Sequence, residues 1–261
     1  MGSTERLDRA LVSRGLASSR SRAQSMILAG SVRVDGAVVR RPAVSVAAGS
    51  AVTADVDPYV SRAAHKLLGA LDDLSLTVAG RALDAGSSTG GFTQVLLERG
   101  CRTVYAVDVG TDQLAPSLRD DPRVLSHERT NLRDLQRSHV GGEPVDLVVA
   151  DVSFISLTML VGPLTAVTER DGWLLLMVKP QFEVGRERLG RGGVVRSPDQ
   201  QAEAVRAVAD AAEPYGWSAA AVVASRLPGP AGNREFFLLL RTTPPDVPPD
   251  IAAAVALPPV G

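Results

Sequence analysis

Apolar residues recur with two different spacings between residues 81 and 241 of this 261-residue chain. Short apolar runs, typical of buried strands, alternate with segments whose apolar residues fall three and four positions apart, as in helices. The expected strands are 81–84, 103–107, 145–150, 173–178, 217–224 and 234–241, and the expected helices are 91–99, 112–118, 157–168 and 199–213. This alternation predicts a mostly parallel sheet with helices on both faces. A short loop joins the last two strands, so we expect one of them to run antiparallel to the rest.

The first 55 residues follow another pattern, in which two short helices precede short strands. Helices are expected over 5–15 and 19–30, because the second begins with a serine, a preferred helix cap, and both end on glycine. An Asp-Gly pair between alternating valines predicts a β-hairpin over 32–39. We therefore expect a small α+β domain over residues 1–55.

Two further segments divide the chain. Residues 56–62 are polar, contain a proline and are interpreted as a linker. The α/β domain should then cover residues 63–243, beginning with a helix that carries Lys66. Residues 244–261 are rich in proline and are expected to form a loosely held tail.

Charge is distributed unevenly along the chain. The net charge is −1, but residues 1–45 contain eight arginines and three acidic residues, a local charge of +5, which leaves −6 for the rest. A basic segment on an otherwise acidic chain is typical of a nucleic-acid-binding module. A solvated, arginine-rich surface would have the same composition, so charge alone leaves both interpretations open.

Lysine is almost absent from the sequence. Of the 28 basic residues, 26 are arginine, and only Lys66 and Lys179 are lysine. An ammonium group can lose its proton at accessible pH, whereas a guanidinium cannot. Lysines that remain in such a sequence are candidates for proton transfer, with chance retention at two tolerant positions as the alternative.

The expected location is the cytoplasm. The single cysteine, Cys101, excludes a disulfide framework and fits a reducing compartment. The N-terminus shows no secretory signal, and no apolar run approaches the roughly 18 residues of a membrane span. We therefore expect no stable membrane association, and the three histidines are too scattered for a metal site.

A glycine-rich loop follows the first strand of the α/β domain. Glycines at this turn let a ligand approach the backbone, and the next helix offers unpaired N–H groups. The dinucleotide pattern requires glycine where Ser88 stands, and the phosphate loop requires lysine where Phe92 stands, so neither fits. The loop instead resembles the Asp-x-Gly-x-x-x-Gly-Gly motif of Rossmann-like methyltransferases, which holds the methionine part of S-adenosylmethionine. The residues concerned are Asp84, Gly86, Ser87, Ser88, Thr89, Gly90, Gly91 and Phe92.

Further contacts to this cofactor are expected at the ends of the following strands. Asp108 ends the second strand, 22 residues after Gly86, where a carboxylate can accept hydrogen bonds from ribose hydroxyls, and Val109 follows it. Asn131, between the expected strands 103–107 and 145–150, would lie near the adenine. Asp151 ends the strand expected over 145–150, at the same edge of the sheet. A single aspartate at a strand end is also often only a cap.

The basic N-terminal segment resembles the α-L RNA-binding motif of a small-subunit ribosomal protein, pseudouridine synthases and tyrosyl-tRNA synthetases. The resemblance covers residues 4 to about 55 and is carried by Arg6, Leu7, Asp8, Ser19, Arg20, Ala23, Ile27, Gly30 and residues 32–36. It implies binding to structured RNA through phosphates and shape. The arginines expected to contact RNA are Arg6, Arg9, Arg20, Arg22 and Arg33.

Four residues carry a resemblance to the FtsJ-type ribose 2′-O-methyltransferases. The Lys-Asp-Lys-Glu tetrad of these enzymes matches Lys66, Asp151, Lys179 and Glu235, in that order. With the α-L motif in front, residues 4–241 resemble the TlyA family of rRNA methyltransferases, whose members have also been called haemolysins. Other matching segments are 61–67, 153–156, 179–183 and 228–230. The chain departs from the family at the linker, where Asp57-Pro58-Tyr59-Val60 replaces Arg-x-Trp-Val.

Two other methyl acceptors are disfavoured. Enzymes that methylate exocyclic amines of bases carry Asp/Asn-Pro-Pro-aromatic where this chain continues from Asp151 with Val-Ser-Phe. Enzymes that methylate a ring carbon need a nucleophilic cysteine in that region. Cys101 lies at the start of the second strand, on the other edge of the predicted sheet.

The resemblance implies that a ribose hydroxyl loses its proton as it attacks the methyl group. A lysine withdrawn from water beside a second cation can act as the base, and we expect Lys179 to do so. Asp151 would orient Lys179, and Lys66 and Glu235 would position the ribose and hold the base without a metal ion. A buried salt-bridge network with no catalytic role is the structural alternative.

The resemblance also implies the partner. The expected acceptors are cytidines of small-subunit or large-subunit rRNA, or both, within ribosomal subunits; no DNA is expected, and the free protein should be monomeric. A non-catalytic ribosome-assembly factor is one alternative, which would keep the RNA-binding motif without needing the tetrad. A membrane-active cytolysin is another, which should carry an amphipathic or membrane-spanning segment that we do not find in the sequence.

Overall fold

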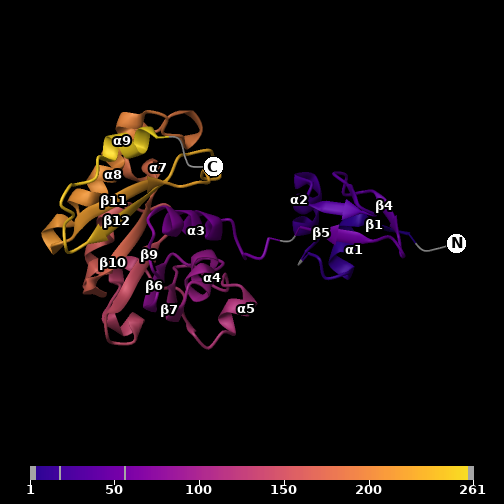
Figure 1. Cartoon of the computed structure of the whole chain (residues 1–261), viewed down its shortest axis with the longest axis horizontal. Helices are drawn as coiled ribbons and strands as arrows, with labels where there is room; N and C mark the ends of the chain where they lie inside the picture. Colours follow the sequence, from indigo (N-terminus) through magenta and orange to yellow (C-terminus); the bar gives the residue numbers. More distant parts are fainter. Residues whose placement is uncertain (1–3, 18, 56, 258–261) are drawn as a thin grey trace. The chain divides into compact units, whose positions relative to one another are not determined.

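The computed structural model of the chain describes residues 4–17, 19–55 and 57–257. Two compact units, Met1–Pro58 and Tyr59–Gly261, are described below one at a time (Figure 1). Residues 1–3 and 18 of the expected N-terminal domain, residue 56 of the expected linker and residues 258–261 of the expected tail lie outside the described residues.

The described part of the N-terminal unit contains two helices, α1 (Leu7–Ser13) and α2 (Arg20–Ala29). The Ser19 side chain accepts a hydrogen bond from the backbone N–H of Arg22 at the start of α2, and Gly30 ends the helix with a φ of 83°. Both predicted helices are therefore present, each slightly shorter than expected.

Within the described residues, five short strands complete this unit. β1 (Thr4–Arg6) pairs antiparallel with β4 (Ser45–Ala47), and β2 (Val32–Val34) lies between β3 (Ala37–Val38) and β5 (Val52–Ala54). The hairpin of β2 and β3 was expected, and its two turn residues have positive φ, as this type of turn requires. The buried side chains that join helices and strands include Leu7, Leu11, Ala23, Ile27, Val32 and Val46.

The sheet of the C-terminal unit has seven strands in the order β11-β12-β10-β9-β6-β7-β8. Their bounds are β6 (Gly80–Ala85), β7 (Cys101–Val107), β8 (Val124–His127), β9 (Val145–Ala150), β10 (Thr168–Val178), β11 (Ser218–Ala224) and β12 (Phe236–Arg241). Strands β6 to β10 pair in parallel, whereas β12 runs antiparallel to β10 and β11. The predicted mostly parallel sheet with one reversed strand is therefore confirmed.

Helices cover both faces of this sheet, as Figure 1 shows. The first core contains side chains of α3 (Ala63–Asp73), α4 (Gly91–Glu98) and α5 (Pro116–Arg119). The second core contains side chains of α6 (Val161–Ala166), α8 (Pro198–Asp210) and α9 (Ile251–Ala256). Successive residues of β12 alternate between them, because Phe236 belongs to the second core and Phe237 to the first. Among the described residues, none of the helices combines the length and the apolar content that a membrane crossing needs.

Two predicted helices are shorter than expected. The helix predicted over 112–118 begins only at Pro116, because a proline disfavours helical conformation in the residue before it and suits the first helical position. The helix predicted over 157–168 becomes a single 3₁₀ turn followed by α6, and Thr168 already belongs to β10, where it pairs with Val145. Strand β10 therefore starts five residues earlier than predicted. The prediction missed this first part because it is polar and lacks the apolar pattern of a strand.

The expectation of a loosely held tail is wrong for residues 250–257. Asp250 caps α9 by accepting a hydrogen bond from the backbone N–H of Ala253 at 3.0 Å. Val255 is fully buried in the second core. The alanine-rich sequence between prolines shows no apolar periodicity, so these tertiary contacts could not be predicted from it.

Candidate active site

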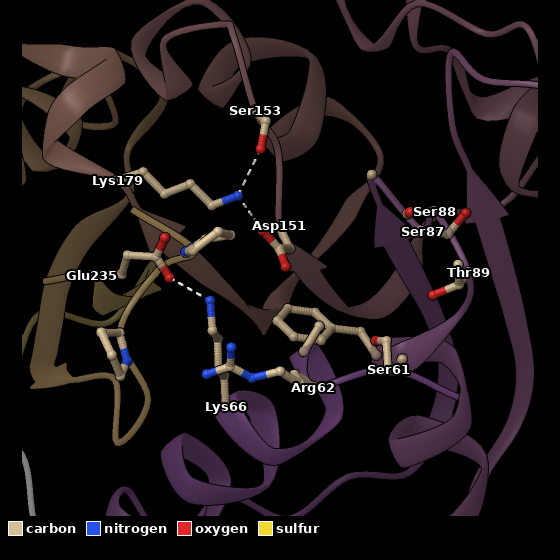
Figure 2. Close-up of a pocket in the computed structure, with 16 residues that line it drawn as sticks. Ser61, Arg62, Lys66, Ser87, Ser88, Thr89, Asp151, Ser153, Lys179 and Glu235 are labelled. Atoms are coloured by element: carbon tan, nitrogen blue, oxygen red, sulfur yellow. Dashed lines mark hydrogen bonds and ion pairs between the residues drawn. The ribbon is translucent and has the colours of Figure 1, made fainter. Parts of the chain in front are cut away.

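One edge of the sheet in the C-terminal unit gathers the four charged residues of the predicted tetrad (Figure 2). Asp151 and Lys179 directly follow the parallel strands β9 and β10, so they lie at the same edge. Glu235 directly precedes β12, and because β12 runs in the opposite direction, its start lies at this edge as well. Lys66 reaches the group from α3.

These four side chains form two ion pairs. Lys66 Nζ lies 2.6 Å from Glu235 Oε2, and Lys179 Nζ lies 2.6 Å from Asp151 Oδ1 (Figure 2). Glu235 is 2% exposed, Lys66 7% and Lys179 9%, so these charges are largely withdrawn from water. Removing one partner of such a pair leaves a buried charge without compensation. The stability of each charged side chain in this group therefore depends on its ion-pair partner.

Ser153 is a further member of this group that the sequence analysis did not single out. The Lys179 ammonium donates a hydrogen bond to Ser153 Oγ at 2.9 Å while it pairs with Asp151. Two acceptors on different residues fix the position of Nζ more closely than one would. The available signal in the sequence was the place of Ser153, three residues beyond the end of β9 at the edge where open α/β sheets bind ligands.

A cavity of about 450 Å³ opens beside the two ion pairs. Its lining includes the tetrad, and also Ser61, Arg62, Pro228 and Pro230, to which the sequence analysis assigned no role in the site. Arg62 is exposed and precedes Lys66 by one helical turn. The loop that carries the two prolines packs closely on the tetrad, because a Cβ atom at Gly229 would lie 2.5 Å from Glu235 Oε1.

The glycine-rich loop between β6 and α4 reaches the same cavity. Gly86 and Gly90 have φ values of 86° and 94°, which favour glycine, and α4 begins at Gly91 with its unpaired N–H groups at this loop. A Cβ atom at Gly86 would lie 2.6 Å from the backbone oxygen of Asp151. Glycine at this position therefore lets the loop approach the strand end that carries Asp151.

Asp84 lies at the end of β6, fully buried beneath this loop. Its Oδ2 accepts a hydrogen bond from Thr93 Oγ1 at 2.6 Å, whereas Oδ1 has no hydrogen-bond partner among the described residues. Burial raises the pKa of the Asp84 carboxyl to about 7, and the nearby charge of Asp151 adds to the rise. The carboxyl is thus poised between its neutral and charged forms near neutral pH.

Replacing Asp84 with asparagine should change how stability depends on pH. An ordinary aspartate releases its proton near pH 3.8, so between about pH 4 and pH 7 the folded protein retains a proton that the unfolded chain has lost. The free energy of unfolding of the wild type should therefore fall through this window, by roughly 4 kcal/mol relative to the variant, whose side chain does not titrate. Urea unfolding of both proteins from pH 4 to pH 8 measures this difference. A difference that does not change with pH would contradict the prediction.

A second cavity, of about 460 Å³, lies on the other side of the glycine-rich loop. Asp108, Val109 and Asn131 line it, together with apolar side chains that include Leu132, Val152 and Ile155. The Asp108 carboxylate accepts hydrogen bonds from the backbone N–H groups of Ser88 and Gly110, at 2.8 and 2.7 Å. A carboxylate has about four acceptor sites, so Asp108 can still accept hydrogen bonds from a ligand.

The two cavities share part of their lining. Gly86, Ser88, Asp151 and Ser153 belong to both. An elongated ligand could therefore extend from Asp108, past the glycine-rich loop, to the tetrad. All the predicted cofactor residues lie along this path except Gly90 and Asp84, which lie beside it in the loop and beneath it.

Phe154 stands out at the mouth of the second cavity. It is 91% exposed and has a φ of 64°, which is rare for a bulky side chain. The Phe182 ring lies 5.3 Å away, centre to centre. Glu183 holds the same loop, since it accepts hydrogen bonds from the Ser156 hydroxyl and the Leu157 backbone N–H. Nothing in the sequence pattern distinguishes Phe154, because its exposure and backbone strain depend on these contacts.

In the N-terminal unit, two of the arginines predicted to bind RNA share a buried partner. Arg6 Nη2 and Arg20 Nε each lie 3.0 Å from Asp8 Oδ2, and Asp8 is fully buried. Hydrogen bonds from Arg6, Gln24 and Arg20 hold the pKa of the Asp8 carboxyl well below its usual range. The other three, Arg9, Arg22 and Arg33, are exposed and have no side-chain partner within the described part of the unit.

Two further arginines of this unit serve its fold. Arg14 donates to the backbone oxygens of Ala47, Ala48 and Ser50, and Arg40 donates to that of Leu28. Their guanidinium groups are thus engaged within the unit. The positive charge counted in the sequence therefore includes arginines that bind groups within the unit and arginines that are exposed without a side-chain partner in its described part. Only the second kind is fully available to a ligand.

No group of three or more histidine, cysteine, aspartate or glutamate side chains within the described residues is arranged to hold a metal ion.

Comparison with known families gives two matches. The model of the FtsJ-like methyltransferase family matches residues 59–242, and that of the S4 domain matches residues 5–52. The family resemblance expected from the sequence is thereby confirmed.

Individual relatives extend over most of the chain. A Mycobacterium tuberculosis protein named 16S/23S rRNA (cytidine-2′-O)-methyltransferase TlyA is 52% identical over 246 residues, which cover 93% of this chain and 91% of that protein. A Campylobacter jejuni protein named 23S rRNA (cytidine-2′-O)-methyltransferase TlyA is 36% identical and covers 69% of each chain. A solved structure from Streptococcus thermophilus that carries the name hemolysin is 36% identical, with a TM-score of 0.75, and covers 98% of this chain and 96% of that one.

Proposed function

The chain belongs to the FtsJ-like methyltransferase family, and we propose that it transfers a methyl group from S-adenosylmethionine to a ribose 2′-hydroxyl of rRNA. The observation that carries this proposal is the tetrad itself, two ion pairs largely withdrawn from water beside a cavity that continues into a second one. The relatives from M. tuberculosis and C. jejuni are named as cytidine-2′-O-methyltransferases, which favours cytidine as the acceptor nucleotide.

The residues around the glycine-rich loop fit S-adenosylmethionine. Asp108 offers acceptors for ribose hydroxyls, and Val109 and Asn131 lie beside an apolar wall suited to an adenine. The buried Oδ1 of Asp84 is without a partner among the described residues, and because Asp84 lines neither cavity, the amino group of a ligand would reach it only through a bridging water. When bound, S-adenosylmethionine supplies an electrophilic methyl group on a positively charged sulfur.

Within the tetrad we assign the base to Lys179. An ammonium group has no lone pair, so Lys179 must first release a proton to water in the cavity before it can accept the proton of the ribose hydroxyl. Asp151 and Ser153 hold its Nζ during this exchange, and Asp151 stabilises the ammonium that forms again. Lys66 and Glu235 form the second pair beside the same cavity, where they would orient the ribose.

We assign recruitment of the RNA to the N-terminal unit. Its exposed arginines can contact phosphates, which positions a structured RNA without reading base identity. Since the proposed acceptor is rRNA within ribosomal subunits, the reaction belongs in the cytoplasm, where these subunits are found. A monomer would suffice, because all residues of the proposed site come from one chain.

The proposed function is tested by single-turnover methyl transfer from labelled S-adenosylmethionine to ribosomal subunits that lack the modification. We expect the label at a ribose 2′-oxygen of one or a few cytidines, mapped by mass spectrometry of RNA fragments. Asp151→Asn, which leaves Lys179 without its counter-ion, should abolish the transfer. Tight binding to subunits without any transfer would favour an assembly factor, and label on a base would contradict ribose methylation.

A further inference from the structure

Three consecutive residues before β12 bind three different parts of the C-terminal unit. Asn233 donates to the backbone oxygen of Gly193 and accepts from the backbone N–H of Val195, both at 2.9 Å. Arg234 binds the end of α9. Glu235 pairs with Lys66 of the tetrad. The start of β12 is therefore a junction at which the position of Glu235 depends on its neighbours.

The contact between Arg234 and α9 has a clear physical basis. Arg234 Nη1 donates to the backbone oxygen of Val255 at 2.8 Å, and Nη2 donates to that of Leu257. These oxygens lie at the C-terminal end of α9, where carbonyl groups lack partners within the helix and attract a cation. The guanidinium also lies over the ring of Phe236, 5.4 Å from its centre. Arg234 is thus fixed at both the helix and the strand.

Helix α9 would not form by itself. It has only six residues, far fewer than an isolated helix needs in water. It is held by the Asp250 cap at its start, by burial of Val255, and by Arg234 at its end. It also lies beyond residue 242, where the match to the FtsJ-like family ends. The family comparison therefore assigns it no role.

Arg234 and Glu235 belong to opposite faces of the sheet. Phe236, beside which Arg234 lies, packs in the second core with α8 and α9, whereas Glu235 pairs with Lys66 of α3, whose neighbours form the first core. The backbone of Glu235 is also tied to the residue that follows β11, since Ser225 N–H donates to the Glu235 backbone oxygen at 2.8 Å. Helix α9 thus supports the backbone of Glu235 from the face opposite to the cavity.

We propose that α9 and Arg234 position Glu235 for methyl transfer, so that the C-terminal helix is part of the support of the active site. This inference rests on the proposed function. Arg234 touches neither cavity and is a positioning residue. Without its hydrogen bonds to α9, Glu235 and its partner Lys66 should shift, and displacements of about 1 Å in an active site can lower turnover by up to about 100-fold.

The test compares Arg234→Gln with Arg170→Gln in the full chain. Arg170 is a matched control, because it also donates to two backbone oxygens, those of Tyr215 and Gly216, and lies over an aromatic ring, that of Trp217. It belongs to the first half of β10, whereas Lys179 follows the other end of that strand. Both variants should lose comparable stability. Only Arg234→Gln should lower kcat, by about 10- to 100-fold, with KM for ribosomal subunits and Kd for S-adenosylmethionine unchanged.

Two more variants sharpen the comparison. Arg234→Lys keeps a cation at the end of α9 and should recover part of the rate. A chain ending at Pro249 lacks α9 and should match Arg234→Gln in kcat, and adding Arg234→Gln to it should lower kcat no further, because both changes remove the same interaction. Equal kcat values for Arg234→Gln and Arg170→Gln would overturn the inference even if the shortened chain fails to fold. A wild-type protein that transfers no methyl group would instead overturn the proposed function.

Discussion

Arginine in place of Lys179 should leave the protein folded and able to bind both S-adenosylmethionine and RNA, yet lower kcat by roughly 10²- to 10⁴-fold, the usual contribution of a general base. The guanidinium keeps the positive charge and can still pair with Asp151, which now lies 2.6 Å from the ammonium. It cannot release a proton near neutral pH. Single-turnover methyl transfer to ribosomal subunits measures the effect without interference from product release.

Lys66→Arg is the matched control for this substitution. Lys66 is the other lysine of the chain, is equally buried, and also pairs with a carboxylate at 2.6 Å. If Lys66 positions the substrate through its charge, arginine should replace it with a much smaller loss of rate. Turnover near that of the wild type in Lys179→Arg would contradict the assignment, and would mean that the proton goes to Lys66 or to water.

Removing residues 1–58 should leave binding of S-adenosylmethionine unchanged and lower kcat/KM for ribosomal subunits by roughly 100-fold or more. Both cavities and the two cores of the C-terminal unit are built from residues after Pro58. The weaker binding to RNA follows because a hydrogen bond to a charged group contributes about 1.5 kcal/mol or more, so the removal of two hydrogen bonds to phosphates suffices. Calorimetry and a methyl-transfer assay on the shortened protein measure the two quantities.

The salt dependence of RNA binding identifies which arginines are responsible. Replacing Arg9, Arg22 and Arg33 together with glutamine should reduce the slope of log K against log salt by about one for each phosphate that the variant no longer neutralises. Arg14→Gln should leave this slope unchanged, because its guanidinium already binds backbone oxygens within the unit. For the truncation described above, a protein without residues 1–58 that is as active as the full chain would show that the N-terminal unit has another purpose.

Much of the site could be predicted because the direction of each strand determines the edge of the sheet at which the residues beside its ends lie. Asp151 and Lys179 follow parallel neighbours, so their meeting at one edge follows from the alternation of strands and helices. Glu235 precedes its strand, and its place beside them required the last strand to be the reversed one. The sequence pattern predicted one reversed strand among the last two and left open which one it was.

The parts that could not be predicted depend on side-chain contacts between distant segments. Ser153 meets Lys179 only because of the path of the loop after β9, where Phe154 takes a positive φ. Helix α9 exists because of contacts with Arg234 and the second core, which no local propensity of its sequence reveals. Likewise, a count of charges cannot tell that Arg14 is engaged by backbone oxygens.

The scarcity of lysine has a consequence for the covalent chemistry of the protein. Apart from the amino terminus, Lys66 and Lys179 are the only primary amines in the chain, and both line one cavity. Among the amines, an acylating or alkylating reagent can therefore modify only the terminus and the two lysines of the proposed active site, which are 7% and 9% exposed and held in ion pairs. Attachment of a dye or a solid support through amines should therefore favour the terminus, whereas modification of either lysine should inactivate the enzyme. Loss of activity on modification of internal amines would therefore report on the two lysines of the proposed active site.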